Sequence, residues 1–491
     1  MSRRNGGIIG PTNTPVGGFV AGSAGGVWRM NDVLTFVSNS QWPKTPENID
    51  NSCRFDDGSN DYLNATLGTG GNSKTFTVSF WFKLGLIPSG NSMNTIGTGV
   101  DNTNDFMIGF SYDTSRTTGI HILARNGSST KVIDVQTNKK FRDLSAWYHA
   151  VIAIDTTQST SSDRVKIYIN GSQETSLLTS TYPDQDTELR WNSANIHYVG
   201  TTRDNQTSAT YDGYLAEVVN VDGQALDPTS FGEFDSTTGI WKPKKIGQIA
   251  NAGTNSFYLN FKDSSNVGKD ESGLGNNFTV NNLTSIDQST DTCSNNFATL
   301  NPLSLNNNTS QNYISLSEGS LKASGTSATN NGNGFSTIGF NSGKWYCEVK
   351  IIDVQGTTYP TVGVQTEENI NRTSGASGQI GYGTTDVVGY APDGQKIIND
   401  SKSSYGNSFT DNDIIGIAID CDNGAVYFSK NGTFQNSGDP TSGASKTNAA
   451  LTFTPSKNYF FGCSVYQSTS IVDFNYGNPA YSISSSNADA N

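Results

Sequence analysis

The feature that most constrains the fold of this 491-residue chain is a strand–turn–strand pattern that occurs twice. Residues 152–173 read IAIDTTQSTSSDRVKIYINGSQ, and residues 417–435 read IAIDCDNGAVYFSKNGTFQ. Each copy has an alternating strand that ends in IAID, a turn, an aromatic-bearing strand and an Asn-Gly dipeptide, which favours a tight hairpin. Two domains with the same antiparallel β architecture explain such a repeat, whereas a single domain with one large core does not require it.

Strict alternation of apolar and polar residues elsewhere in the chain also indicates antiparallel sheet. In FTVSFWFKL, residues 76–84, one face is apolar and the other carries Thr77, Ser79, Trp81 and Lys83. Such a pattern predicts a sheet with one buried face and one solvent-exposed face. Charged residues make up only 15% of the chain, against about 25% in an average soluble domain. We therefore expect an all-β protein with two jelly-roll sandwiches in tandem and an extended N-terminal arm.

The spacing of the predicted strands divides the chain into five parts. Residues 1–45 are rich in Gly and Pro and hold too little apolar surface to fold alone, so they are predicted to order against a partner. The other four parts are a first sandwich at 46–235, a loop-rich connector with one short strand at 236–305, a second sandwich at 306–482 and a flexible tail at 483–491.

The charge balance and the cysteines exclude several classes of protein. The formal net charge is −13, which argues against nucleic acid and anionic membranes as partners. No apolar run is long enough for a secretory signal or a membrane span, so we expect no membrane insertion. The five cysteines form no CxxC pair, and Cys347, Cys421 and Cys463 fall on apolar strand faces. They are predicted to be buried thiols.

Several motifs resemble known families. The first sandwich resembles laminin G-like domains of the concanavalin A-like class through FTVSFWFK, WYHAVIAID, VKIYINGS and DGYLAEVVNVDGQAL at residues 76–83, 147–155, 165–172 and 212–226. The second resembles SPRY domains through GKWYCEV, VGV, DIIGIAIDCDNGAVYFSKNG and FGCSVYQSTSIVDFNYG at residues 343–349, 362–364, 413–432 and 461–477. Both families share a concanavalin-type sandwich, which agrees with the repeated strand–turn–strand pattern.

Two further segments, residues 6–15 and 213–244, resemble virion structural proteins of marine tailed bacteriophages. This resemblance implies a non-enzymatic protein of the virion surface, assembled in the host cytoplasm. We expect a fibre or adhesin that binds host surface glycan or protein. The alternatives are a capsid decoration or head-fibre protein with a mainly structural role, and a glycan depolymerase. The arm would contact other virion proteins of the capsid, portal or tail, and the protein would be a homo-oligomer, with a trimer as one form.

Candidate contact residues follow from these expectations. Apolar residues of the arm are predicted to anchor it to the virion: Ile8, Ile9, Pro11, Val27, Trp28 and Trp42. Aromatic residues in polar, Gly-rich surroundings are candidate ligand contacts, because aromatic faces stack on sugars and anchor interfaces: Tyr112, Tyr182, Trp191, Tyr382 and Tyr405.

The acidic residues give weaker evidence for a metal site. The connector carboxylates Asp263, Asp270 and Glu271 could hold calcium, with a hydrated loop as the alternative. The segment DCDNG at residues 420–424 resembles the start of a calcium loop, but Asn occupies its twelfth position, so a tight turn is favoured.

Catalytic motifs are weaker still. The alternating carboxylates of DQDTE at residues 184–188 could serve sugar hydrolysis, but a solvated turn is favoured. His149, at the head of a strand, is predicted to be a sheet-surface residue. We expect no catalytic residues and no required cofactor.

Overall fold

The computed structural model describes residues 48–87, 92–111, 119–204, 209–246, 252–303, 313–370 and 379–484, with the backbone alone of residues 7–9, 27–29 and 369. In the arm, β1 (Gly7–Ile9) pairs antiparallel with β2 (Val27–Arg29). The predicted anchors Ile8, Ile9, Val27 and Trp28 are therefore described by backbone only. Pro11 and Trp42 lie outside the described residues, as does most of the predicted tail.

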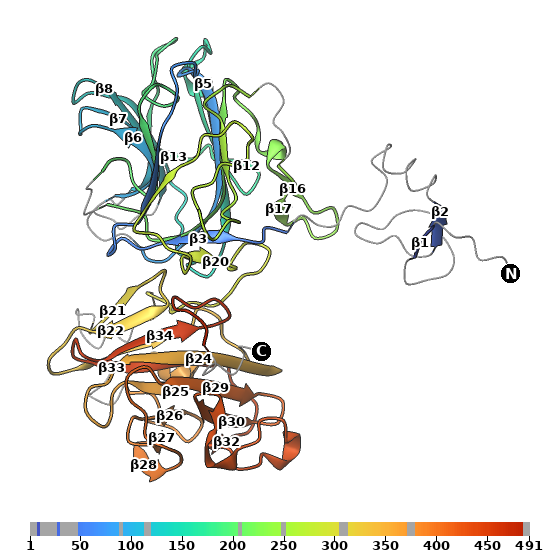
Figure 1. The fold of residues 1–491 in the computed structure, drawn as a ribbon, viewed down its shortest axis with the longest axis vertical. Coiled ribbons are helices and arrows are strands. Elements are labelled where there is room, and N and C mark those ends of the chain that lie inside the picture. Colours follow the sequence, from blue (N-terminus) through green and yellow to red (C-terminus); the bar gives the residue numbers. More distant parts are fainter. Residues whose placement is uncertain are drawn as a thin grey trace.

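The first sandwich consists of two antiparallel eight-stranded sheets that face each other (Figure 1). Sheet 1 has the order β12 (Ser172–Gln173), β11 (Val165–Ile169), β10 (Tyr148–Asp155), β5 (Thr75–Leu84), β15 (Gly213–Asp222), β3 (Ser52–Phe55) and β20 (Gln288–Ser289), and β18 (Phe257–Leu259) also pairs with β15. Sheet 2 has the order β13 (Leu177–Thr181), β9 (Lys131–Thr137), β8 (Gly119–Asn126), β7 (Asn104–Ser111), β6 (Met93–Gly99), β14 (Ile196–Val199), β4 (Tyr62–Thr66) and β19 (Thr279–Asn281).

The apolar faces of the two sheets form one core. On β5, Phe76, Val78, Phe80 and Phe82 point inward and are at most 1% exposed, as the alternation predicts. Burial of each such side chain contributes about 1.5–3 kcal/mol relative to an exposed one. The ring of Phe82 lies 4.9 Å from that of Phe110 on β7, which joins the two sheets.

The opposite face of β5 is buried, whereas the sequence predicted a solvent-exposed face. Thr77, Ser79, Trp81 and Lys83 are all at most 4% exposed. The hairpin of β16 (Gly232–Phe234) and β17 (Trp241–Pro243) covers part of this face, because Trp241 belongs to the same buried cluster as Trp81. The prediction failed because the covering residues are remote in sequence.

The segment after the first sandwich also has more strand structure than the predicted loop-rich connector. Its strands β18, β19 and β20 pair with β15, β4 and β3 and so extend both sheets of the first sandwich. Lys83 donates to Asp291, Asn296 and the Phe297 carbonyl at 2.7–2.9 Å. These residues therefore complete the first sandwich rather than merely linking two domains.

The second sandwich has the same architecture. Sheet 3 has the order β21 (Ile314–Ser317), β22 (Lys322–Gly325), β34 (Ile471–Asn475), β24 (Lys344–Asp353), β29 (Ile414–Asp420), β30 (Ala425–Lys430) and β31 (Thr433–Phe434), with β32 (Leu451–Thr452) on β30. Sheet 4 has the order β23 (Asn331–Phe335), β33 (Tyr459–Tyr466), β25 (Thr361–Thr366), β26 (Val388–Tyr390), β27 (Gln395–Ile398) and β28 (Ser401–Ser404). As predicted, Cys347, Cys421 and Cys463 are buried in its core.

Helical structure in the described ranges is confined to short turns. They are α2 (Glu367–Ile370) and the 3-10 helices η1 (Ser161–Asp163), η2 (Pro228–Ser230), η3 (Gln435–Ser437) and η4 (Gly443–Ser445). Among the described residues, no helix has the length and apolar character needed to cross a bilayer. The chain is thus all-β, with two sandwiches in tandem.

The two sandwiches touch at the end of the first, where β3 and β20 lie (Figure 1). The Tyr214 hydroxyl donates to the Gly319 carbonyl at 3.2 Å. Arg54, which is 1% exposed, pairs with Asp287 at 2.9 Å and with Glu318 of the second sandwich at 3.5 Å. The junction therefore holds buried polar contacts from both sandwiches.

Candidate functional site

A polar groove lies on the outer face of sheet 2, away from the core. Its volume is about 380 Å³. The strands β6, β7 and β8 form its floor, because alternate residues of a strand point to the same face. The groove is lined by Ser92, Asn94, Gly99, Asp101, Asn102, Asp105, Met107, Ser111, His121, Leu123, Arg125, Lys131, Thr202, Arg203 and Ala209.

Ion pairs fix the charged side chains across the groove floor. Asp105 and Arg125 are directly opposite in the β7–β8 register, and their side chains meet at 2.7 Å. His121 Nε2 lies 2.8 Å from Asp134 Oδ1 on β9. The hydrogen bond from His121, followed by that from Lys131, lowers the pKa of Asp134, although partial burial opposes the shift. These contacts hold the polar groups in place before any ligand arrives.

Several buried polar atoms in the groove have no hydrogen-bond partner among the described residues. They are Asn94 Oδ1, Asp105 Oδ1 and His121 Nδ1. A buried polar atom without a partner costs about 1–3 kcal/mol, so such atoms usually meet water or a ligand. The apolar side chains of Met107 and Leu123 lie opposite each other between the polar groups. The floor thus combines fixed polar groups with an apolar strip.

Sequence reasoning missed this groove, although a signal was present. Asp105 and Met107 alternate on β7, and His121, Leu123 and Arg125 alternate on β8. These positions could have been identified as an outward face with an unusual concentration of polar and charged groups. What the sequence does not show is that β6 lies beside β14, which brings Thr202 and Arg203 to the same groove.

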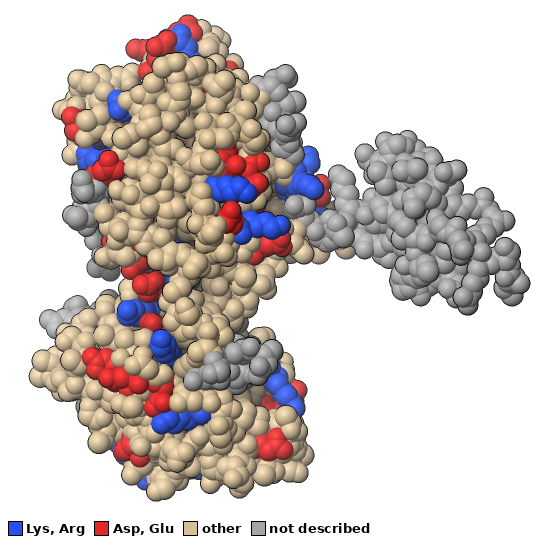
Figure 2. Space-filling model, viewed as in Figure 1, with Lys and Arg blue, Asp and Glu red and all other residues tan. Residues whose placement is uncertain are grey.

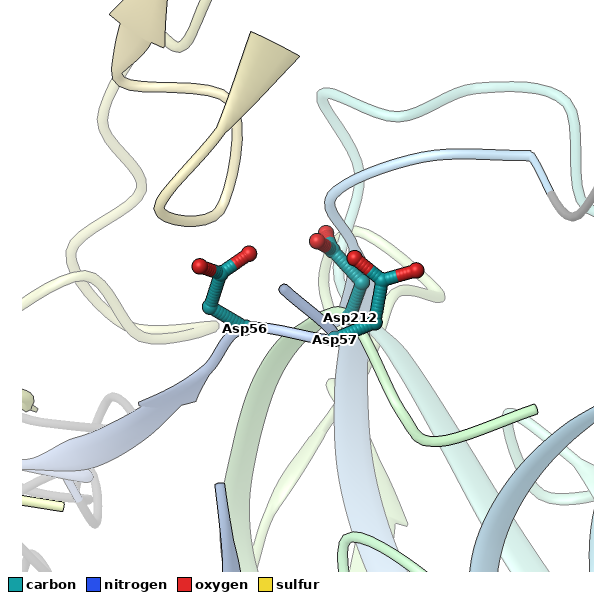
Figure 3. A group of neighbouring side chains, drawn as sticks. All are labelled: Asp56, Asp57 and Asp212. Carbon is teal, nitrogen blue, oxygen red and sulfur yellow. The ribbon is translucent and has the colours of Figure 1, made fainter. Parts of the chain in front are cut away.

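A second candidate site, a group of three carboxylates, lies at the junction end of the first sandwich. Asp56 and Asp57 directly follow β3, and Asp212 directly precedes β15, the strand that pairs with β3. One carboxylate oxygen of each residue lies within 4.8 Å of the others. Figure 3 shows the three carboxylates pointing to the same side of the β3–β15 end.

The carboxylate of Asp212 is in an unfavourable environment for a charge. Its side chain is 1% exposed, and neither oxygen has a hydrogen-bond partner of regular geometry in the described parts of the chain. Burial, followed by the charges of Asp56 and Asp57, raises the pKa of Asp212 well above its ordinary value. No Lys, Arg or His of the described ranges forms an ion pair with any of the three.

The predicted aromatic ligand contacts are dispersed over both sandwiches. Tyr112 lies outside the described residues and directly follows Ser111, which lines the groove. Tyr182 and Tyr382 are half-buried, and the structure does not bring them to one site. Trp191 and Tyr405 are corrected: Trp191 is 0% exposed in the first core and donates to Asn220 at 2.9 Å, and Tyr405 is 7% exposed in the second core. Their polar sequence neighbours concealed this burial.

The predicted calcium carboxylates of the connector have partners within the chain. Asp270 accepts hydrogen bonds from the backbone of Tyr258 and Asn276, each at 2.9 Å. Lys269 lies 2.8 Å from Glu271 and 4.0 Å from Asp263. Calcium at this segment remains a prediction.

The other acidic motifs form turns. Asp184, Asp186 and Glu188 are exposed in the loop after β13, and Lys74 lies 4.0 and 3.9 Å from Asp186 and Glu188. Asp420 accepts from the backbone N–H of Asn423 at 2.9 Å in the turn between β29 and β30. Both segments have the geometry of the turns that the sequence favoured over catalytic or calcium-binding ones.

His149 is not a sheet-surface residue, contrary to the sequence prediction. It is 1% exposed, because the β16–β17 hairpin covers it. Desolvation lowers its pKa to about 3. Trp241 Nε1 donates to His149 Nδ1 at 3.0 Å, so His149 Nε2 carries the proton and donates to Ser79 Oγ at 2.9 Å.

Charged side chains are sparse on the surface in view in Figure 2, and acidic and basic groups lie next to each other there rather than in separate patches.

The fold comprises two β-sandwiches, of which the first carries a polar groove on one sheet face. Residues 57–229 match the family model of the concanavalin A-like lectin/glucanases superfamily. Residues 344–478 match the SPRY domain model. The predicted laminin G-like and SPRY domains are thus confirmed.

Comparison with solved structures finds several similar chains. The SPRY domain of human HERC1 is 18% identical, with a TM-score of 0.27, covering 36% of this chain and 98% of its own. A protein from Bacteroides ovatus proposed to bind carbohydrate is 15% identical, with a TM-score of 0.35, covering 48% of this chain and 60% of its own. Stonustoxin is 18% identical, with a TM-score of 0.26, covering 36% of this chain and 27% of its own. No curated protein matches the chain in sequence.

Proposed function

We propose that the chain is a non-enzymatic, glycan-binding protein of the surface of a tailed-phage virion, and that the groove on sheet 2 binds the glycan. The observation that carries the binding site is the set of fixed, buried polar atoms without partners in this groove: Asn94 Oδ1, Asp105 Oδ1 and His121 Nδ1. The match of this sandwich to a superfamily that includes lectins supports the proposal.

The chemistry of the groove suits a sugar better than an apolar ligand. Sugar hydroxyls both donate and accept, so they satisfy carboxylate, amide and imidazole atoms in one small area. Arg125 and Asp105 already hold each other at 2.7 Å, so little side-chain entropy is lost when a hydroxyl bonds to the pair. Met107 and Leu123 offer an apolar strip to the C–H groups of a sugar ring.

The virion location is supported by the resemblance of residues 6–15 and 213–244 to phage structural proteins, and by an arm that lacks a core of its own. In this proposal the arm contacts capsid, portal or tail proteins, and the homo-oligomer presents the sandwiches outward. A decoration or head-fibre protein is the second candidate. Copy number per virion separates the two, since tens of copies indicate fibres and hundreds indicate a decorated shell.

A binding assay with the full chain tests the groove. Wild-type protein, Arg125→Gln and the exposed control Arg142→Gln are compared on an array of bacterial surface polysaccharides, after circular dichroism has shown that all three are folded. We expect at least a tenfold loss of affinity for Arg125→Gln, because Asp105 then loses its ion pair and the sugar loses a charged donor. Equal binding by the two variants would exclude the groove.

The same assay addresses a depolymerase. Release of reducing ends from the bound polysaccharide would replace binding by hydrolysis as the activity. Deletion of residues 2–45 tests the arm, since the truncated protein should fold and bind glycan but fail to enter virions. Normal incorporation of the truncated protein would contradict the anchoring role.

A further inference from the structure

We infer that Asp56, Asp57 and Asp212 form a binding site for one calcium ion at the junction end of the first sandwich. The three residues come from two paired strands, β3 and β15, so the sheet itself brings them together. This site is separate from the glycan groove, which lies on the outer face of sheet 2. The inference therefore does not depend on the proposed function.

The geometry of the carboxylates fits a large, hard cation. All donors are oxygen atoms, which calcium and magnesium prefer, whereas zinc favours His and Cys. Oxygens about 2.4 Å from one calcium ion lie up to about 4.8 Å apart. One carboxylate oxygen from each of Asp56, Asp57 and Asp212 lies within 4.8 Å of the other two, so small side-chain rotations would bring all three onto one such ion. Figure 3 shows that the carboxylates point to a common side.

A buried carboxylate without a regular hydrogen bond supplies a second observation. Asp212 is 1% exposed, and neither of its oxygens has a hydrogen-bond partner of regular geometry among the described residues; its looser contacts are with the side chain of Asp56 and the backbone of Asp57, inside the site itself. Asp56 is 6% exposed, and its Oδ1 likewise has none. Two buried carboxylates this close cannot both ionise favourably without a counter-charge, and a bound cation supplies that charge together with partners for their oxygens.

The choice of calcium over magnesium follows from coordination geometry. Calcium takes 6–8 oxygen ligands in a flexible arrangement, whereas magnesium requires a near-ideal octahedron. Asp61, 4% exposed, accepts the backbone N–H of Asp56 through Oδ2 at 3.1 Å and so holds the loop that carries Asp56 and Asp57. Three carboxylates from two strand ends, completed by water, therefore suit calcium better than magnesium.

The site lies next to the contact between the two sandwiches. A Cβ atom on Gly85 would be 2.0 Å from Asp212 Oδ1 and 3.1 Å from the Cα of Gly319, so Gly85 separates the carboxylate from the second sandwich. The Ser320 hydroxyl donates to the Gly85 carbonyl. Calcium at Asp212 would therefore stiffen the strand ends that touch the second sandwich.

The experiment uses the full chain, stripped with EDTA and exchanged into chelator-free buffer. Isothermal titration with CaCl₂, and separately with MgCl₂, gives stoichiometry and affinity, and differential scanning calorimetry gives the melting temperature with and without calcium. We expect one calcium ion per chain, weaker binding of magnesium, and a rise in the melting temperature with calcium.

Three variants make the assignment specific. Asp57 is exposed, so Asp57→Asn should fold normally and bind calcium at least tenfold more weakly. Asp212→Asn removes a buried carboxylate that lies beside two others, so it should melt at least as high as wild type in EDTA and lose the calcium response. Asp263→Asn, in the connector, tests the alternative location and should leave calcium binding at Asp56, Asp57 and Asp212 unchanged.

Other outcomes would overturn the inference. Absence of calcium binding by stripped wild-type protein excludes the site. Binding that survives both Asp57→Asn and Asp212→Asn but is lost in Asp263→Asn places the ion in the connector instead. If Asp212→Asn does not fold, the comparison of Asp57→Asn with Asp263→Asn still decides between the two locations.

Discussion

Asn170 and Asn431 occupy equivalent positions in the two sandwiches. Both have a φ of 47°, and each is followed by a glycine with a φ of 79° or 77°. The side-chain oxygen of Asn170 accepts the backbone N–H of His149 at 2.8 Å, and that of Asn431 accepts the backbone N–H of Ile414 at 2.8 Å. Each asparagine thus ties a tight turn to the start of a central strand, at the second residue of β10 and the first residue of β29.

Substitution of these asparagines should separate the two roles of the side chain. Asn170→Ala loses the hydrogen bond and places a Cβ-bearing residue without a local acceptor at positive φ, so we expect a loss of about 2 kcal/mol. Asn170→Gly keeps the backbone conformation and should lose about 1 kcal/mol. Asn431→Ala and Asn431→Gly should behave alike in the second sandwich. Urea unfolding measures all four, and equal stability of the Ala and Gly variants would contradict this account.

The buried His149 should make the first sandwich sensitive to acid. Its pKa is about 3 in the folded protein because of desolvation, against about 6.5 in an unfolded chain. The neutral form is therefore required: its contribution is fully present above pH 6.5 and is lost as the pH falls toward 3. The full effect is about 3–5 kcal/mol.

A variant isolates this effect from the titration of carboxylates. His149→Gln cannot take up the proton, so the stability difference between wild type and variant should shrink as the pH falls from 7 to 4. Denaturant unfolding of both proteins at pH 7, 5.5 and 4 measures that difference. A constant difference across this range would show that His149 does not control acid sensitivity.

The ion pair of Lys83 and Asp291 should be costly to break on one side. Lys83 is 0% exposed and lies 2.8 Å from Asp291, which is itself 2% exposed. Lys83→Met leaves a buried carboxylate without its cation, so we expect a loss of about 3–5 kcal/mol. Asp291→Asn leaves the buried ammonium and should cost a similar amount.

The double variant Lys83→Met/Asp291→Asn provides the control. It removes both charges, so its loss should be clearly smaller than the sum of the two single losses. Thermal or urea unfolding of the four proteins closes the cycle. Additive losses would mean that the pair does not interact energetically.

The sequence was sufficient for the fold but not for the environment of individual side chains. The alternation of Phe76, Val78, Phe80 and Phe82 fixes which face of β5 is apolar, and the structure confirms that face as core. The same alternation places Lys83 in water, yet Asp291, 208 residues further along the chain, covers it. Periodicity reports the local face of a strand, whereas covering by a remote segment depends on tertiary contacts.

The candidate sites depend on tertiary contacts in the same way. The groove needs Asp105 and Arg125 from adjacent strands, and it also needs residues after β14, which is a neighbour of β6 only in the folded sheet. The pair of Asp56 and Asp212 exists because β3 pairs with β15. Polar residues at these positions are visible in the sequence, but their convergence is not.

Trp241 should be the residue that holds the β16–β17 hairpin on sheet 1. Its ring stacks on His149 at 5.9 Å between centroids, and its indole N–H donates to His149 Nδ1 at 3.0 Å. Trp241→Ala removes both contacts and leaves a cavity above Trp81, so we expect a loss of about 3–5 kcal/mol. Trp241→Phe keeps the stacked ring but leaves His149 Nδ1 without a donor, so we expect this variant to lose about 1–2 kcal/mol of stability.

Two measurements check this prediction. Urea unfolding gives the two losses, and limited proteolysis should cleave the hairpin faster in Trp241→Ala than in Trp241→Phe or wild type. The exposed Ile240, in the same hairpin, gives the control: Ile240→Ala shortens an apolar side chain that is 66% exposed and should change stability much less. If Ile240→Ala and Trp241→Ala are equally destabilised, the hairpin is held by its own strand pairing and turn rather than by its contact with His149.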